Sequence, residues 1–291
     1  MNCESPSSKG TPGHGPAIDL APKSKMGLTL HNPVMPAAGC FGFGTEYADL
    51  VDTTGLGAIV VGPFTARPRR GVHPPRAVPI ADGVLVHTGL ANPGLTAAIR
   101  RYSAAWERSP VPVIAHVAGT GPDEVLTCCE RLGETPGIAA IELGLPDNTY
   151  DSEVDELVSA ARSSTFCPLI VRLPLAHADE LCEAAVSAGA DVLTVAAPPR
   201  GTVWHKASQR LVQGRLYGRF VHPLVVRSLC LVSDLVDAPL IACGGIHDVD
   251  DALVCMRAGA VAVQIGGAMW AHPSRLTCIA ASIALAIGRG G

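Results

Sequence analysis

Lysine is the residue that this sequence most clearly lacks. The 291 residues include only Lys9, Lys23, Lys25 and Lys206, and arginine supplies nearly all other positive charge. An enzyme that works through a Schiff base needs a lysine amine inside its pocket. Because three of the four lysines lie in the first 25 residues, the sequence argues against this class of chemistry.

Charged and aromatic residues are also scarce, at 16% and 4% of the chain. The formal net charge of -4 does not favour a polyanion, so we expect no nucleic acid as a partner. Hydrophobic residues make up 48% of the chain, with alanine, valine, leucine and glycine far ahead of aromatic residues. This composition is typical of buried parallel strands covered by helices.

Paired-cysteine motifs are missing, although the chain has 10 cysteines. Without a C-x-x-C motif or a recurring spacing, the sequence favours neither a disulfide framework nor a zinc or iron–sulfur site. No apolar run reaches the length that crosses a membrane, and the first residues contain no signal-like apolar core. We therefore expect a cytoplasmic protein whose cysteines are mostly reduced.

The N-terminal segment differs in composition from the rest of the chain. Residues 1–25 are polar and rich in proline, glycine and serine, which predicts a flexible extension. From Met26 onward, short apolar runs alternate with amphipathic segments about every 30 residues. We expect residues 26–291 to form a single domain.

Eight apolar runs are predicted strands, at residues 32–39, 57–62, 111–119, 139–145, 168–174, 191–198, 239–245 and 260–267. Predicted helices follow them at 46–54, 94–107, 122–132, 152–163, 178–188, 221–235, 249–258 and 274–286. Eight strands that alternate with eight helices predict an α/β fold of the (βα)8 TIM-barrel type. An open doubly wound sheet is the alternative, but no G-x-G-x-x-G follows the first strand.

Two connections are unusually long, at residues 63–110 and 199–222. In a barrel the chemistry lies at the C-terminal ends of the strands, so long insertions at that end predict the walls of a ligand site. Trp204 and His205 are candidate wall residues in the second insertion. The alternative is that the insertions only pad the surface.

Paired glycines end the last two predicted strands, in "ACGGIHD" and "QIGGAMW". Barrels often hold a phosphate on these two loops, because glycine lets the backbone N–H groups approach the anion. The sequence therefore predicts a phosphate site at Gly244, Gly245, Gly266 and Gly267. Both a phosphate-bearing cofactor and a phosphorylated substrate fit this pattern.

Several strings together carry a resemblance to a known family: "NPVMPAAGCFGFGTEYADL", "TARPRRGVHPPR", "GLANPG", "IELGL", "GRLYGRFVHPL", "ACGGIHDVDDA" and "AGAVAVQIGGA". They resemble the class 1 dihydroorotate dehydrogenases, especially the catalytic subunit of the type that works with an electron-transfer partner. The resemblance covers residues 26–286 in unbroken order.

This resemblance implies an FMN-containing barrel that oxidises dihydroorotate to orotate in pyrimidine biosynthesis. It also implies a homodimer and a partner subunit that carries FAD and an iron–sulfur cluster. Because this chain has no iron–sulfur cysteine set, any NAD-linked activity would need that partner.

The cofactor side of the family pattern is largely retained. The resemblance implies that Ala37, Ala38 and Gly39 lie beside the flavin ring, with Thr65 on a neighbouring loop and Gly218 before the seventh helix. The four paired glycines named above match the phosphate cradle. Where the family has a lysine near the flavin N1/O2 edge, this sequence has Arg172, which keeps a cation but presents it as a planar fork.

The substrate side departs from the family pattern at most positions. Family side chains that hold or deprotonate the substrate are replaced here by Gly62, His87, Gly144, Pro146, Asp147 and Ala196. Each ligand group left without a hydrogen-bond partner would cost roughly 1–3 kcal/mol. We therefore expect orotate to bind poorly or a different small molecule to be the substrate.

Three residues are candidates for the catalytic acid or base: Asp147, His87 and Cys40. Asp147 takes the position of the family's cysteine base, but "PDN" also reads as an ordinary turn without chemistry. His87 could be an acid, a base or an anion contact, or a structural loop histidine. Asn92 and Asn148 are candidate substrate contacts, although Asn-Pro-Gly is also turn chemistry.

Two functions therefore stay open from the sequence. The first is a flavin-dependent dehydrogenase that acts on a CH–CH group, on dihydroorotate or on another small molecule. The second is a catalytically degenerate barrel that serves as a structural or partner subunit.

Overall fold

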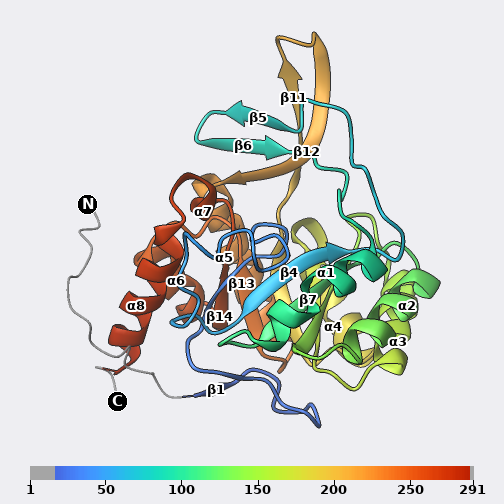
Figure 1. Ribbon diagram of the computed structural model, residues 1–291. Helices are drawn as coiled ribbons and strands as arrows, with labels where there is room; N and C mark the ends of the chain where they lie inside the picture. The colour runs from blue at the N-terminus through green and yellow to red at the C-terminus, as the bar shows by residue number, and fades with distance from the viewer. Residues whose placement is uncertain (1–16, 289–291) are drawn as a thin grey trace.

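The computed structural model describes residues 17–288 and has a barrel of eight parallel strands at its centre (Figure 1). The strand order is β3, β14, β13, β10, β9, β8, β7 and β4. The two ends of this sheet meet where Gly57 N–H donates to the Val34 carbonyl at 2.9 Å, so the barrel is nearly closed. The strands are β3 (Val34–Pro36), β4 (Ile59–Phe64), β7 (Val113–Ala118), β8 (Ile138–Gly144), β9 (Leu169–Pro174), β10 (Val192–Ala197), β13 (Leu240–Cys243) and β14 (Ala260–Ile265).

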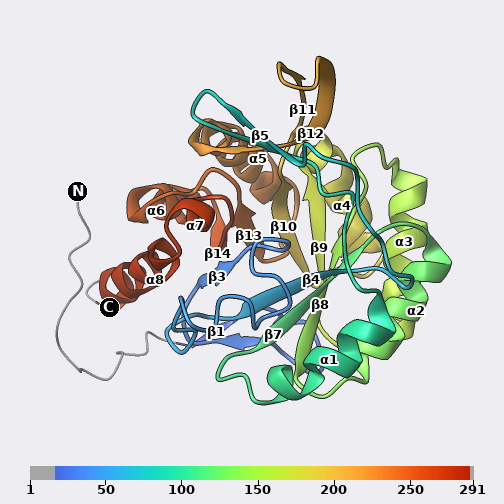
Figure 2. The same cartoon turned by 45° about the horizontal axis from the view of Figure 1, so that its top comes forward.

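Helices surround this barrel, as the turned view shows (Figure 2). They are α1 (Leu95–Glu107), α2 (Pro122–Gly133), α3 (Asp151–Ser164), α4 (Ala178–Ser187), α5 (His222–Leu235), α6 (Val249–Arg257), α7 (Ala268–Ala271) and α8 (Ser274–Gly288). The predicted TIM barrel is confirmed, and all eight predicted strands are present. Seven of the eight predicted helices also match these bounds, and α7 is an additional short helix.

The helix predicted at residues 46–54 is wrong, because this segment forms turns. The carboxylate of Glu46 accepts hydrogen bonds from the backbone N–H groups of Phe43, at 2.8 Å, and Thr45, at 3.1 Å. Asp52 accepts from the Thr54 backbone N–H at 3.0 Å. These local bonds offer the backbone an alternative to a helix, and the segment is too short to offset the cost of helix nucleation.

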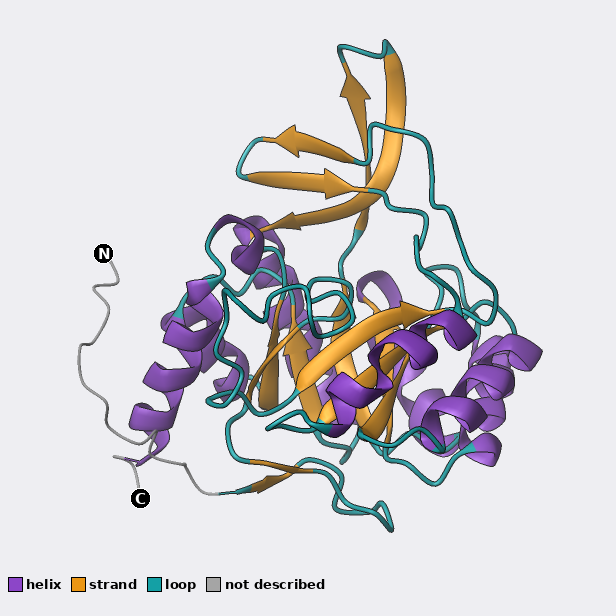
Figure 3. Ribbon diagram, in the orientation of Figure 1, coloured by secondary structure: helices purple, strands orange, loops and turns teal. Residues whose placement is uncertain are grey.

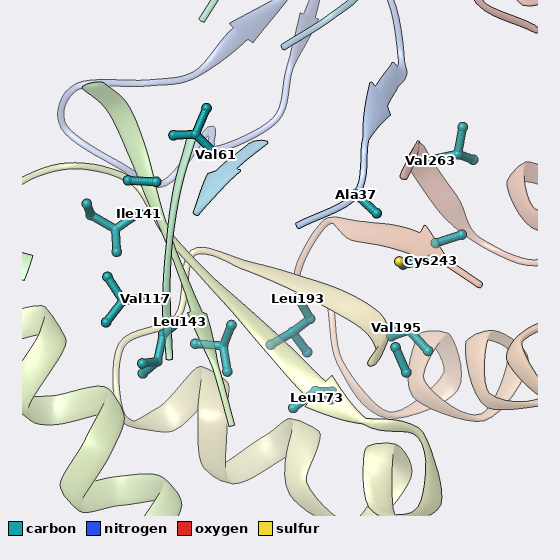
Figure 4. Packing of buried hydrophobic residues seen from close by; sticks show 14 of the residues in the cluster. Ala37, Val61, Val117, Ile141, Leu143, Leu173, Leu193, Val195, Cys243 and Val263 are labelled. Carbon is teal, nitrogen blue, oxygen red and sulfur yellow. The ribbon is translucent and has the colours of Figure 1, made fainter. Parts of the chain in front are cut away.

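The strand side chains pack on both faces of the barrel wall. Residues that point outward, among them Val117, Leu143 and Leu193, join the large core cluster between strands and helices (Figure 4). A separate apolar layer fills the lower barrel interior, with Met35, Val60, Ile114, Ala140, Ile170, Val192, Ile241 and Ala262. These eight residues come one from each strand, as expected for inward-facing positions of a closed barrel.

A two-stranded hairpin covers the lower end of the barrel, formed by β1 (Ile18–Asp19) and β2 (Thr29–Leu30) (Figure 1). Leu20 and Ala21 are fully buried there and belong to the cluster of the lower interior layer. This part of the expected N-terminal extension therefore belongs to the folded domain. The remainder, residues 1–16, lies outside the described residues.

The two long insertions form one antiparallel sheet above the opposite end of the barrel (Figure 3). Its strands are β5 (Ala77–Ile80), β6 (Gly83–Val86), β11 (Arg200–His205) and β12 (Arg210–Gly218), in the order β11, β12, β6, β5. Val78, Leu85 and Val212 form its own small apolar core. The sheet stands over the C-terminal ends of the parallel strands, where the insertions were expected to wall a site.

Candidate functional site

A cleft lies between the C-terminal strand ends and the antiparallel sheet. Nine of the predicted site residues line it: Ala37, Ala38, Cys40, Arg172, Gly218, Gly244, Gly245, Gly266 and Gly267. Tyr217 and His247 are further lining residues. The structure thus brings together one group of residues that the sequence scatters from the first strand to the last.

Glycine is required where the β13 loop meets the start of α5. Gly244 and Gly245 have φ angles of 129° and 70°, a region that other residues rarely adopt. A Cβ atom on Gly245 would lie 2.2 Å from the backbone nitrogen of His222. The backbone of this loop can therefore approach both α5 and the cleft closely.

The other glycine pair leaves space in the cleft itself. A Cβ atom on Gly266 would lie 3.5 Å from Cys40 Sγ and 3.6 Å from Ala37 Cβ, and both of these residues line the cleft. Any longer side chain at position 266 would enter the space between them. Gly267 follows directly, and α7 begins at the next residue.

A polar layer lies above the apolar layer of the barrel interior, and its centre is the fully buried Glu142 on β8. Its Oε1 accepts from Arg172 Nε at 3.0 Å and lies 2.8 Å from His116 Nδ1. Its Oε2 accepts from Thr194 Oγ1 at 3.1 Å and from Gln264 Nε2 at 2.6 Å. Arg172 also donates to Gln264 Oε1 and, at 3.5 Å, to Cys243 Sγ.

Opposite charges in this layer keep each other ionised. Burial alone would raise the pKa of Glu142, but the Arg172 charge and the hydrogen bonds from His116 and Gln264 hold this pKa far below its usual range. Burial would likewise lower the pKa of Arg172, yet Glu142 raises it. Arg172, which lines the cleft, is therefore one partner of a compensated ion pair whose other partner, Glu142, is buried in the barrel interior.

Sequence analysis missed Glu142, His116, Thr194 and Gln264. Each follows an apolar residue of the lower layer by two positions, as Glu142 follows Ala140 and Gln264 follows Ala262. Since side chains in a strand alternate with a period of two, these polar residues must face the same interior. A search for polar residues at such positions in apolar runs would have found them.

The Cys40 thiol is buried in the cleft lining. Burial and the neighbouring Cys243 raise its pKa while Arg172 lowers it, and the net result is a pKa of about 12. A thiol in this state is protonated at neutral pH and is a poor nucleophile or base.

Asp147 is bound by two arginines rather than directed into the cleft. Its Oδ1 accepts from Arg215 Nη1 at 2.9 Å, and its Oδ2 accepts from Arg215 Nη2 at 3.1 Å and Arg200 Nε at 2.6 Å. Residues 147–148 form a turn, and Asn148 lines a separate surface depression with Tyr150. The ion pairs tie the β8–α3 loop to the antiparallel sheet, in which Arg200 and Arg215 are cross-strand partners.

Asn92 and Thr65 serve the turn that precedes α1. Asn92 Nδ2 donates to Thr65 Oγ1 at 2.8 Å and to the Leu90 carbonyl at 2.7 Å. Asn92 Oδ1 accepts from the Gly94 backbone N–H at 2.8 Å. Both ends of this amide are thus occupied by local structure.

The remaining sequence candidates lie away from the cleft lining. His87 follows β6 in the antiparallel sheet, where its backbone N–H donates to the Arg76 carbonyl at 2.7 Å. Trp204 and His205 form the far end of β11, and Trp204 is 53% exposed. They lie next to the turn between β11 and β12 and are not among the residues that line the cleft, so the prediction of cleft walls is wrong for this pair.

No group of residues in the described part of the chain could hold a metal ion through three or more histidine, cysteine or acidic side chains. Helices long and apolar enough to cross a membrane are likewise not found between residues 17 and 288.

Comparison with known proteins gives one consistent match. The family model described as dihydroorotate dehydrogenase matches residues 21–285. The chain is 37% identical to the dihydroorotate dehydrogenase B (NAD(+)) catalytic subunit of Desulforudis audaxviator, over 88% of this chain and 89% of the relative. It is 36% identical to the subunit of the same name from Cutibacterium acnes, over 86% and 87% of the two chains.

A solved structure supports the same fold. DHODH from Eimeria tenella, in complex with ferulenol, superimposes with a TM-score of 0.76 over 94% of this chain and 85% of that chain. The two sequences are 19% identical, so this likeness concerns the fold.

Proposed function

The chain belongs to the dihydroorotate dehydrogenase family, and from this premise we propose that it is an FMN-dependent oxidoreductase that removes two hydrogens from a CH–CH group. Dihydroorotate is the first substrate to test. The single observation that carries the proposal is the cleft itself, because it combines paired glycine loops with a buried cation, Arg172. A cation beside the flavin pyrimidine stabilises the reduced, anionic ring.

The cleft residues fit an FMN molecule. Gly244, Gly245, Gly266 and Gly267 would cradle its phosphate, and Gly266 leaves open the space that a side chain would fill. Ala38 would lie beside the ring, and Arg172 would face its N1/O2 edge, as the family pattern implies. Bound FMN would supply the hydride acceptor of the reaction.

The residues at the family's substrate-binding positions support a recognition of dihydroorotate that is weaker than in the family or altered. Asn92 is occupied by its own turn, Asp147 is occupied by two arginines, and the family's amide positions are Gly144 and Ala196. The substrate is therefore a dihydroorotate-like molecule that needs few amide contacts. We infer an electron-transfer partner subunit with FAD and an iron–sulfur cluster, because the relatives are named as catalytic subunits that use NAD(+).

A substitution at Gly266 tests the cofactor assignment. Gly266→Val places a branched side chain between Cys40 and Ala37, so we expect a folded protein without flavin absorbance in the presence of excess FMN. Gly55→Val is the matched control, because a Cβ atom on Gly55 meets nothing within 4 Å. Wild type and control should be yellow and should bind one FMN per chain.

The same preparation separates the two functions left open by the sequence. Anaerobic addition of dihydroorotate should bleach the flavin absorbance of the wild-type protein. Wild-type protein that stays colourless in excess FMN would refute the flavoenzyme and support the degenerate barrel. Bound flavin that stays oxidised would leave FMN binding in place and refute dihydroorotate as the substrate.

A further inference from the structure

The proposed oxidation needs a group that accepts a proton from the substrate, and the structure argues against the sequence candidates for this role. Both oxygens of Asp147 accept hydrogen bonds from guanidinium groups. The Cys40 thiol is protonated, and His87 follows β6 in the antiparallel sheet rather than lying on a barrel strand. Another residue must therefore serve, if the cleft is catalytic.

His116 on β7 is a histidine of the barrel interior that the proposed function has not yet used. It pairs in register with Glu142 on β8, and its Nδ1 lies 2.8 Å from Glu142 Oε1. Because Glu142 is an ionised acceptor, Nδ1 carries the proton of this hydrogen bond. The second nitrogen, Nε2, has no hydrogen-bond partner among residues 17–286 and therefore presents its lone pair.

The His116 ring can take its position because the last residue of β8, Gly144, has no side chain. A Cβ atom on Gly144 would lie 2.7 Å from His116 Cε1 and 3.1 Å from His116 Nε2. The Cε1–Nε2 edge of the imidazole thus fills the space over the last residue of β8, at the barrel end that bears the cleft. The ring would be excluded from this place by any residue other than glycine at position 144.

The surroundings of His116 hold the ring neutral but able to take up a proton. Burial lowers its pKa below the usual 6.5, the Glu142 hydrogen bond and charge raise it in part, and the charges of Arg172 and Arg215 lower it again. Its side chain is 12% exposed, so a proton can leave to solvent. Glu142 on β8, Arg172 on β9 and Arg215 on β12 are the charged groups that act on this ring.

We propose that His116 Nε2 accepts the proton in this reaction, an inference that rests on the proposed function. The C–H bond of one substrate carbon breaks, its proton binds Nε2, and its electron pair becomes the new C=C bond. Bound FMN would supply the two-electron acceptor for the hydride that leaves the neighbouring carbon. The resulting imidazolium is stabilised by Glu142 and then releases its proton to water.

His116→Asn tests the proposal, because asparagine can still donate to Glu142 but lacks an atom at the place of Nε2. The holoenzyme is mixed anaerobically with dihydroorotate, and the rate of flavin bleaching is followed from pH 5 to pH 9. General bases contribute about 100-fold to 10,000-fold. We expect the variant to lose at least about 100-fold in rate while its flavin content and melting temperature stay close to wild type.

The pH profile distinguishes a base from a structural histidine. The wild-type rate should rise with pH through the His116 pKa, below 6.5, and then level off, because only the neutral ring accepts a proton. His116→Asn should lose this rise. His116→Gln is the second variant, in case asparagine disturbs the network.

His177→Asn is the matched control, because His177 Nδ1 lies 2.9 Å from Glu180 Oε2 in an exposed pair. It should keep the wild-type rate within about twofold. A folded His116→Asn protein with a near wild-type rate and an unchanged pH profile would overturn the proposal.

A second measurement does not depend on turnover of dihydroorotate. Long-range ¹H–¹⁵N spectra of the labelled holoenzyme at pH 7.5 report the tautomer of each histidine, and His116→Asn assigns the signal. A proton on Nδ1 with a bare Nε2 supports the proposal, whereas a proton on Nε2 overturns it. If wild-type flavin is not reduced by dihydroorotate, the substrate assignment fails, and these spectra still decide on His116.

Discussion

Glu142 shows how a single residue can organise a buried site. Four side chains hydrogen-bond to its two oxygens, and they come from strands β7, β9, β10 and β14. A buried carboxylate is costly unless it is paired and its lone pairs are satisfied. Here Arg172 supplies the charge, and the other three side chains supply further hydrogen bonds.

At this scale we predict the effect of Glu142→Gln on stability. The variant leaves the Arg172 charge buried without compensation, which should lower the free energy of unfolding by about 3–5 kcal/mol. Urea unfolding of the holoenzyme measures this change. Glu180→Gln removes a charge from an exposed pair and should change stability by less than about 0.5 kcal/mol.

The same variant should flatten the acid side of the stability profile. The folded-state pKa of Glu142 lies below the unfolded value of about 4.5, so the folded state binds this proton only at lower pH. The stabilisation is complete above about pH 4.5 and is lost as the pH falls further. Wild-type stability should therefore drop more steeply than that of Glu142→Gln between pH 4.5 and pH 3. Parallel acid limbs for the two proteins would contradict this assignment.

Elements that are distant in sequence cooperate above the barrel. The strands β5 and β6 come from one insertion, and β11 and β12 come from another, more than 100 residues later. The pairing of β6 with β12 joins the two insertions into one antiparallel sheet above the cleft. Asp147, on the β8–α3 loop, connects this loop to the sheet through ion pairs with Arg200 and Arg215.

We predict that Asp147→Asn loosens this connection and leaves His116, the proposed proton acceptor, in place. Hydrogen exchange at residues 145–150 should become faster, because the two guanidinium contacts weaken. The free energy of unfolding should change by no more than about 1 kcal/mol, since these ion pairs are partly exposed. The rate of flavin reduction should stay within about tenfold of wild type.

Asp155→Asn, on the exposed face of α3, is the control. A rate loss of 100-fold or more in Asp147→Asn would instead identify the carboxylate as the base.

The molecule as a whole is a barrel with an apolar lower half and a polar upper half. The lower interior is closed by the hairpin of β1 and β2 and by the buried Leu20. The upper interior carries the Glu142 network. The antiparallel sheet stands over this end of the barrel (Figure 1). The apolar core layer and the proposed active site therefore lie at opposite ends of the same strands, as is usual for this fold.

At this scale we predict that Leu20 is part of the barrel's structural core. Leu20→Ala removes a fully buried side chain from the lower cluster and should cost about 2–4 kcal/mol. Thermal unfolding of the holoenzyme measures the loss, while flavin absorbance per folded chain should stay unchanged. Met26→Ala, at a side chain that is 61% exposed, should have little effect. An equal melting temperature for Leu20→Ala and wild type would show that this segment does not stabilise the barrel core.

Much of the architecture could be read from the sequence, because the period of apolar residues and the paired glycines are local signals. These signals predicted all eight barrel strands, seven helices and the loops at Gly244 and Gly266. The segment 46–54 was misjudged, because side-chain hydrogen bonds of Glu46 and Asp52 decide its turns. The hydrogen-bond partners of Asp147 and His116 could not be predicted, since these partners lie on other strands.

The sequence by itself determined that this chain is a family member with an α/β barrel, because alternating apolar runs and short motifs need no knowledge of distant contacts. Only the tertiary structure decided which polar residues share the buried network around Glu142. Charge and hydrogen-bond partners act over a few ångströms in space, whereas His116, Glu142, Arg172 and Gln264 are separated by up to 148 residues along the chain. Barrel closure brings these four residues together. Asp147 instead forms ion pairs with Arg200 and Arg215 of the antiparallel sheet.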